Sequence, residues 1–336
     1  MKGKHISLVM FLLLVGLSFV SLFIGVIEIT PTMLINGNIT TWQVMLASRL
    51  PRLLAILCTG MGMSVAGLIM QQLCSNKFVS PTTGATISSA QFGILLSLLV
   101  IPNSSLMMRT LFSFTFSIIG TLIFVWFIQR IRFKDVVMVP LVGIMFSSVI
   151  GGVTSFLAFK YQLTQSLSSY LTGHFSHIIR GRYEIIWLVV PLVILAFIYA
   201  NYFNIVGLGK DFSKNLGVPY RLVLTFGLVL AAMLTASVVV TVGSVSYIGL
   251  VVPNIITLYK GDKIKGTLID VALFGALFVL VCDMIGRILI FPYELPVNLI
   301  AGILGSLIFI SFLLQRLHAS KRVVGKLAKK GGCSND

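Results

Sequence analysis

Charge is scarce in this sequence. Only 10% of its 336 residues are Asp, Glu, Lys or Arg, whereas 57% are hydrophobic. A soluble domain of this length would need considerably more charge to cover its surface, so a soluble all-α protein with a very apolar core is a poor alternative. Apolar runs of about 20 residues, enough to cross a hydrocarbon layer of about 30 Å, recur along the whole chain. The composition therefore predicts a polytopic all-α membrane protein.

The chain also lacks the usual marks of catalysis and of disulfide scaffolds. Its four cysteines form no CxxC pair, and we expect all of them to be unpaired thiols. The GxxxxGK[ST], HExxH and GxSxG patterns are absent. Gly60-Met-Gly62 begins like a dinucleotide fingerprint, but the third glycine is missing. We therefore expect a chain that is not an enzyme, with no cofactor, no metal site and no ATPase site of its own.

About ten apolar spans can be read along the chain. The first follows Lys2 and Lys4 and exceeds the 7–15 residues of a signal-peptide core, so we expect a retained helix. The eighth is short and contains Gly249 and Pro253, which leaves open nine spans plus a re-entrant segment. The predicted spans are 6–27, 52–72, 84–101, 108–128, 136–159, 185–203, 222–241, 246–259, 267–291 and 295–315.

The net charge is +16, but the basic residues are not distributed as in a nucleic-acid-binding protein. Most of the 25 Lys and Arg residues fall in short segments that ten crossings with a cytoplasmic N-terminus would place inside. This bias predicts that both termini are cytoplasmic. No segment between spans is long enough for a core of its own. We expect one transmembrane domain over residues 1–336, with a basic cytoplasmic tail at about 316–336, and no nucleic-acid partner.

The segment from Arg49 to Gly84 is the most distinctive part of the chain. Two arginines flank Pro51 at the start of an apolar helix that is rich in Gly, Ser and Ala and ends in Gln71 and Gln72. Small residues let helix backbones approach closely in lipid, where no hydrophobic force drives helices together. The pattern predicts a helix in the centre of the bundle.

A second distinctive segment, 206–220, separates the sixth and seventh spans. Asp211 and Ser213 are N-cap types, and Gly217 before Val218-Pro219 is a helix stop. The segment predicts a short helix at about 211–216, lying across the cytoplasmic face. Such a helix could contact a cytoplasmic partner.

Two pairs of polar residues invite functional alternatives. Asp283 and Arg287 have the i, i+4 spacing of an intramembrane ion pair, although an acid at this depth could also mark a proton or sodium pathway. His174 and His177 lie one helical turn apart in an exterior segment and could bind a metal ion or haem. We favour an ion pair for the first and an ordinary surface or interfacial pair for the second.

Several segments, in order, resemble the iron–siderophore and cobalamin importer permeases of binding-protein-dependent ABC systems, the FecCD-type transmembrane subunits. The similar motifs are Arg49-Leu-Pro-Arg52, Ala66-Gly67 with Gln71, Asn76–Pro81, the loop 207–217, Tyr247–Asn254, Cys282–Arg287 and Glu294-Leu-Pro296. Asn254 stands where the family usually has histidine, and Lys77 where it has proline. The stretch Ala85–Ala90 also departs from the family pattern. In these departures the chain resembles a ferric-siderophore branch of the family, whose transporters often contain two different permease chains.

The resemblance implies a set of partners. An extracytoplasmic siderophore-binding protein would deliver a ferric siderophore to a pair of permease chains, identical or paralogous, in the cell membrane. Two cytoplasmic ATPase subunits would bind ATP and Mg²⁺. Haem or cobalamin is the alternative cargo within the family. The alternatives outside the family are an ion-coupled secondary transporter and a membrane enzyme or structural membrane protein.

The resemblance also implies roles for individual residues. The docking arginines would be Arg49, Arg52 and Arg287. The contact with the ATPase would be made by Leu208, Gly209, Lys210, Asp211, Phe212, Ser213, Leu216 and Gly217. The translocation path at the dimer interface would be lined by Gly60, Ser64, Gly67, Gln71, Ser88 and Gln91.

Overall fold

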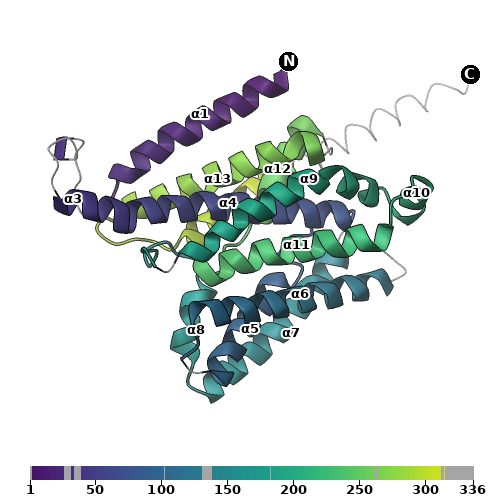
Figure 1. The fold of residues 1–336 in the computed structure, drawn as a ribbon, viewed down its shortest axis with the longest axis horizontal. Helices are drawn as coiled ribbons and strands as arrows, with labels where there is room; N and C mark the ends of the chain where they lie inside the picture. Colours follow the sequence, from purple (N-terminus) through teal and green to yellow (C-terminus); the bar gives the residue numbers. More distant parts are fainter. Residues whose placement is uncertain are drawn as a thin grey trace, which may run out of the picture.

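The computed structural model of the chain is almost entirely helical (Figure 1). It describes residues 2–25, 32–33, 39–101, 103–130, 138–181, 183–261, 264–311 and 314, so the predicted basic tail lies outside the described residues. Within these ranges, β pairing is limited to one isolated bridge between Ile290 and Tyr293. The helices are α1 (Lys2–Phe23), α3 (Ile39–Val44), η1 (Met45–Arg49), α4 (Leu50–Leu73), α5 (Thr86–Val100), α6 (Leu106–Arg130), α7 (Met138–Lys160), α8 (Thr164–Leu171), η2 (Glu184–Leu188), α9 (Val189–Gly207), α10 (Lys210–Asn215), α11 (Tyr220–Thr241), α12 (Ile248–Lys260), α13 (Ile264–Ile288) and a last helix, Val297–Ser311.

The predicted spans all coincide with helices. Among the described residues, 7 helices are long and apolar enough to cross a membrane, and three shorter apolar helices, α5, α12 and Val297–Ser311, account for the remaining spans. The prediction of about ten membrane helices is confirmed. The short eighth span is α12, whose 13 residues rise about 20 Å, or roughly two thirds of the hydrocarbon thickness.

The second span begins earlier than predicted. Helix runs without interruption over Ile39–Leu73, so the arginines around Pro51 lie within the helix and not at its mouth. The backbone accommodates the proline through a π-helical turn, Met45–Arg49, in which the N–H of Leu50 donates to the carbonyl of Met45. Proline has no N–H and crowds the preceding turn, and a π-bulge relieves both problems. The sequence reading missed this upstream helix because it treated the proline as a start signal.

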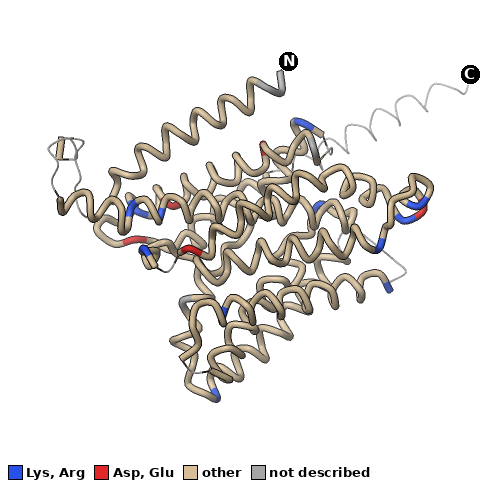
Figure 2. Tube along the Cα trace, viewed as in Figure 1, with Lys and Arg blue, Asp and Glu red and all other residues tan. Residues whose placement is uncertain are grey.

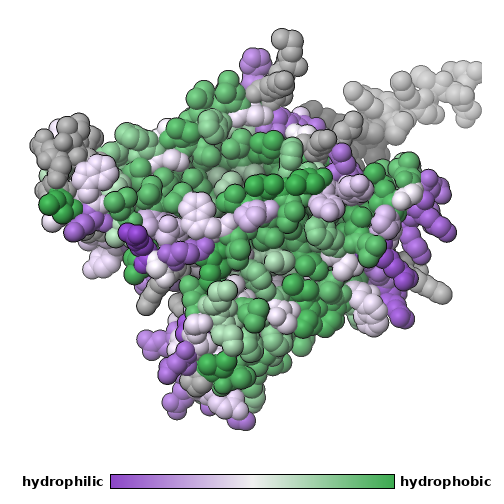
Figure 3. Space-filling model, in the orientation of Figure 1, coloured by the Kyte–Doolittle hydropathy of each residue, from purple (hydrophilic) through white to green (hydrophobic). Residues whose placement is uncertain are grey.

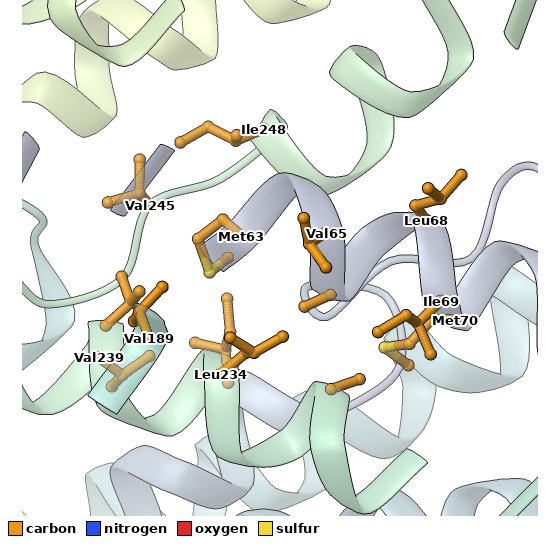
Figure 4. Close-up of a cluster of buried hydrophobic side chains, with 14 of the residues drawn as sticks. Met63, Val65, Leu68, Ile69, Met70, Val189, Leu234, Val239, Val245 and Ile248 are labelled. Atoms are coloured by element: carbon orange, nitrogen blue, oxygen red, sulfur yellow. The ribbon is translucent and has the colours of Figure 1, made fainter. Parts of the chain in front are cut away.

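Helix α4 occupies the centre of the bundle, as its small residues predict. It packs against α13, α11, α9 and α12, and most of its side chains are buried. A Cβ at Gly60 would overlap the carbonyl oxygen of Gly275 on α13, and one at Gly67 would overlap that of Gly249 on α12. Figure 4 shows the apolar cluster on the neighbouring faces, with Met63 and Leu234 facing one another. The glycines therefore permit backbone contact between helices.

Charged residues gather at the two ends of the bundle (Figure 2). One end carries α3 and α8, and the other carries α10 (Figure 1). The surface between them is largely apolar in Figure 3. This distribution is that of a multi-pass membrane protein whose polar ends face water on either side. We call the α10 end cytoplasmic, following the orientation predicted from the basic residues.

Candidate functional site

Four charged side chains meet near the α3 end, where the sequence predicted only one pair. Arg52 of α4 donates from Nη2 to Oδ1 of Asp283 at 2.8 Å. Its Nη1 donates to both carboxylate oxygens of Glu294, at 2.8 and 2.9 Å. Asp283 also forms an ion pair with Arg287 one turn further along α13. We call these four residues the charge cluster. Its members come from α4, from α13 and from the loop after α13.

Burial makes this cluster structurally important. Asp283 and Arg287 are each only 4% exposed, and the Glu294 side chain is 24% exposed at the edge of the cluster. A buried charge is tolerated only when partners offset its loss of hydration. Here two cations meet two anions, so the described side chains balance one another in charge.

Arg287 also holds the first helix. It donates to the carbonyl oxygens of Ser21 and Ile24, at 3.1 and 2.9 Å, and to the hydroxyl of Ser21 at 2.6 Å. Few other residues of α1 are enclosed by the bundle, since only 11% of the α1 span is buried. Hydrogen bonds to charged donors are the strong ones in a medium of low polarity. Both terminal nitrogens of Arg287 are therefore held by its own chain, through Asp283, Ser21 and Ile24.

A second clamp joins α1 to α13 at the opposite end. Asp270 of α13 is 2% exposed, accepts a hydrogen bond from Ser7 at 2.5 Å and pairs with Lys260 of α12. Asp270 lies within the predicted span 267–291, and the sequence reading assigned it no partner. A single sequence does not show that Ser7, 263 positions away, approaches Asp270, or that Lys260 also donates to the Ser7 hydroxyl at 3.0 Å.

Arg49 differs from the other two predicted docking arginines. Its side chain is half-buried at the rim of the same end, beside the Arg52 turn, and donates to the carbonyl oxygen of Ile24. Arg52 and Arg287 lie deeper and are held by the charge cluster. Of the three, Arg49 is therefore the arginine most accessible to a protein docking from outside.

Four of the predicted path residues are enclosed by their own subunit. Gly60 and Gly67 contact neighbouring backbones, as described above. Ser64 is fully buried and donates to the carbonyl of Val271 at 3.0 Å, and Gln71 donates to those of Gly249 and Leu250 at 3.3 Å. In this structure all four residues pack or hydrogen-bond within the chain. Their part in lining a translocation path stays a prediction.

The other two predicted path residues lie on α5 and keep some exposure. Ser88 and Gln91 are both half-buried. Gln91 donates to the carbonyl of Tyr170, at the end of α8, at 3.0 Å. This contact joins α5 to the exterior segment that follows α7.

The short helix α10 lies where the sequence predicted it, but its cap differs. Gly209, and not Asp211 or Ser213, precedes its first residue, with a φ of 110° that favours glycine. Ser213 is buried and donates to the carbonyls of Ile205 and Gly209. Gly217 ends the helix with a φ of 71°, as predicted. The hydroxyl of Ser213 thus fixes α10 to α9.

Helix α10 presents an apolar stripe at the end of the bundle. Leu208, Phe212 and Leu216 follow one another at intervals of four residues and are all exposed, with Phe212 at 49%. Lys210, Asp211 and Lys214 are exposed beside them. Exposed apolar side chains rimmed by polar ones are typical of a protein-binding surface.

The two histidines lie against each other at the outer end. Their ring centroids are 4.6 Å apart, and Nδ1 of His174 is 2.8 Å from the carbonyl oxygen of Thr172. Among the described residues there is no group of three or more His, Cys, Asp or Glu side chains that could hold a metal ion. The pair borders a pocket of about 290 Å³ together with Tyr170 and Leu106.

Glu294 is the functional candidate that the sequence reading missed. It was noted only as part of Glu294-Leu-Pro296, with no role. One signal could have identified it, namely that it is one of only nine acids in the chain and follows the ninth span closely. Its partner Arg52 could not be identified without the fold.

Comparisons with known proteins agree on one family. The chain is 44% identical to the petrobactin import system permease YclN of Bacillus subtilis over 91% of this chain and 97% of that protein. It is 38% identical to the ferric-anguibactin transport system permease FatD of Vibrio anguillarum, over 89% of this chain and 95% of that one. A solved structure described by the words "metal-chelate type ABC transporter", in an inward-facing conformation, shares the fold with a TM-score of 0.79 at 24% identity. The structural match covers 93% of this chain and 99% of the chain in that structure. The FecCD transport family matches residues 12–316, and the chain belongs to this family.

Proposed function

We propose that this chain is a membrane permease subunit of an ABC importer that carries a ferric siderophore into the cytoplasm. The observation that carries the proposal is the 44% identity, over nearly the full length of both chains, to a petrobactin importer permease. The described helices include 7 that are long and apolar enough to cross a membrane, which suits a permease.

We propose the same partners that the resemblance implied. Residues 1–336 would form one permease domain that pairs with a second permease chain. Two ATPase subunits would bind ATP and Mg²⁺ and press against α10 through the stripe of Leu208, Phe212 and Leu216. Energy would then pass from α10 to α9 through the buried Ser213, whose hydroxyl bonds the carbonyl of Ile205.

Docking of a binding protein is proposed at the outer end, with Arg49 as the direct contact. Arg52 and Arg287 would support the docking surface by holding α4, α13 and α1 together. Glu294 would be the acid nearest to the docked partner, because it is the most exposed anion of the charge cluster. For the translocation path, we propose the residues that the resemblance implied, Gly60, Ser64, Gly67 and Gln71 of α4 with Ser88 and Gln91 of α5.

The experiment that tests this proposal is reconstituted transport. The permease, its second chain, the ATPase and the binding protein would be placed in proteoliposomes, with ferric petrobactin, ferric anguibactin, haem and cobalamin as cargo. We expect ATP-dependent uptake of a ferric siderophore and none of haem or cobalamin. Uptake driven by an ion gradient without ATPase would instead support a secondary transporter.

A further inference from the structure

A pocket opens between the cytoplasmic ends of α6 and α11. Its volume is about 460 Å³, within the range of roughly 300–1,000 Å³ that small-molecule sites occupy. Its polar wall consists of Gln129 and Arg130 at the end of α6 and Arg221 at the start of α11. Its inner wall is apolar and includes Val125 and Leu224. The pocket lies apart from the charge cluster, at the other end of the bundle.

The two arginines give this pocket a positively charged wall. Both side chains are exposed, and within the described part of the chain neither forms an ion pair with an acid. The guanidinium of Arg130 lies 5.0 Å from the ring centroid of Trp126, which also lines the pocket. This cation–π contact fixes the arginine at the pocket while leaving its N–H donors available. Two guanidinium groups in the wall of one pocket favour the binding of a phosphate group.

The surroundings favour a phosphate that carries acyl chains. Trp126 is 57% exposed, and Ile123 and Ile119 follow it along the same face of α6, both exposed. These residues form an apolar stripe that leads from the pocket towards the middle of the bundle. Tryptophan next to arginine at the end of a membrane helix is the usual arrangement at the lipid headgroup level.

We propose that this pocket binds an anionic phospholipid of the cytoplasmic leaflet. The phosphate is held between Arg130 and Arg221, Gln129 donates to a headgroup oxygen, and one acyl chain lies along Ile123 and Ile119. Basic pockets between membrane helices on the cytoplasmic side are suited to such headgroups. Free phosphate could bind the two arginines, but it has no acyl chain to cover the apolar stripe. The site is independent of the cargo and of the docking surface.

The test is lipid selectivity of the full-length permease. Purified protein in detergent is mixed with equal amounts of phosphatidylglycerol and phosphatidylethanolamine, and retained lipid is counted by native mass spectrometry. We expect a preference for phosphatidylglycerol of about tenfold, which corresponds to about 1.4 kcal/mol, because cationic side chains at the cytoplasmic surface attract anionic headgroups. The double variant Arg130→Gln/Arg221→Gln should lose that preference. Lys214→Gln, an exposed cation on the same side but outside the pocket, is the matched control and should retain it.

Two further arms separate the sources of the anion and guard against misfolding. Inorganic phosphate at millimolar concentration should not displace the lipid, and displacement would overturn the assignment in favour of a soluble anion. Leu224→Trp, which fills the pocket while keeping both arginines, should also reduce lipid retention. Selectivity that survives in both the double variant and Leu224→Trp, with wild-type thermal unfolding, would overturn the proposal.

Discussion

Arg52 and Glu294 lie 242 positions apart in the chain and form a bidentate ion pair, with both carboxylate oxygens within 2.9 Å of one guanidinium nitrogen. The same guanidinium reaches Asp283 through its other nitrogen. Arg52 therefore joins α4 both to α13 and to the loop after α13. Because these bonds lie where we propose that a binding protein docks, the cluster couples the packing of three elements to the docking surface.

The first prediction concerns Asp283, the buried anion between two arginines. Asp283→Asn leaves Arg287 without its anionic partner, and removal of one member of a buried ion pair typically costs about 3–5 kcal/mol. We expect a strong loss of thermal stability of the purified permease, measured by the unfolding midpoint in detergent. Glu294→Gln should cost much less, because its side chain is 24% exposed and water replaces part of the lost interaction.

A double variant distinguishes charge from shape at this position. Asp283→Asn combined with Arg287→Gln removes one charge of each sign and should recover part of the lost stability. If the stability lost in the double variant equals the sum of the losses in the two single variants, the two residues do not act as a pair.

The second prediction concerns the close approach of α4 to α12. A Cβ at Gly67 would overlap the carbonyl oxygen of Gly249, which is backbone and cannot rotate away. Gly67→Ala should therefore lower stability by about 1–3 kcal/mol, the usual cost of overpacking. Gly16→Ala in α1 is the control, because a Cβ there meets nothing within 4 Å. Equal unfolding midpoints for the two variants would contradict the close contact between α4 and α12 at Gly67.

The sequence predicted the helices well and their contacts poorly. Apolar runs and small residues are local signals, so the ten spans, α10 and the central place of α4 could be found from them. The assignment of Gly60, Ser64, Gly67 and Gln71 to a path stays a prediction, because small and polar residues suit both a pore and a packed interface. Their partners within the chain, such as the carbonyl of Val271 for Ser64, could not be predicted from the sequence. The pairing of Glu294 with Arg52 could not be predicted either, since an ion pair over 242 positions leaves no local pattern in one sequence.

The third prediction concerns coupling to the ATPase. Phe212 is the aromatic residue in the exposed stripe of α10, and aromatic anchors carry a large share of interface energy. Phe212→Ser should weaken association with the ATPase at least tenfold, as measured by co-purification and by binding to the reconstituted permease. Asn215→Ser changes an exposed polar residue of the same helix and is the control. Normal ATPase retention by Phe212→Ser would remove α10 from the proposed interface.

The fourth prediction concerns docking at the outer end. Arg49→Glu reverses a half-exposed charge at the rim, and rim charges chiefly set the rate of encounter with a partner. We expect the association rate of the binding protein to fall about tenfold at low salt, with a smaller difference at high salt because screening weakens long-range attraction. Arg180→Glu, on the same end and exposed, is the control for net charge. Charge reversal at Arg52 or Arg287 would also disrupt the charge cluster, so those variants should lose stability as well as docking. A stable Arg287→Glu permease that still docks normally would contradict both the burial argument and the supporting role proposed for Arg287.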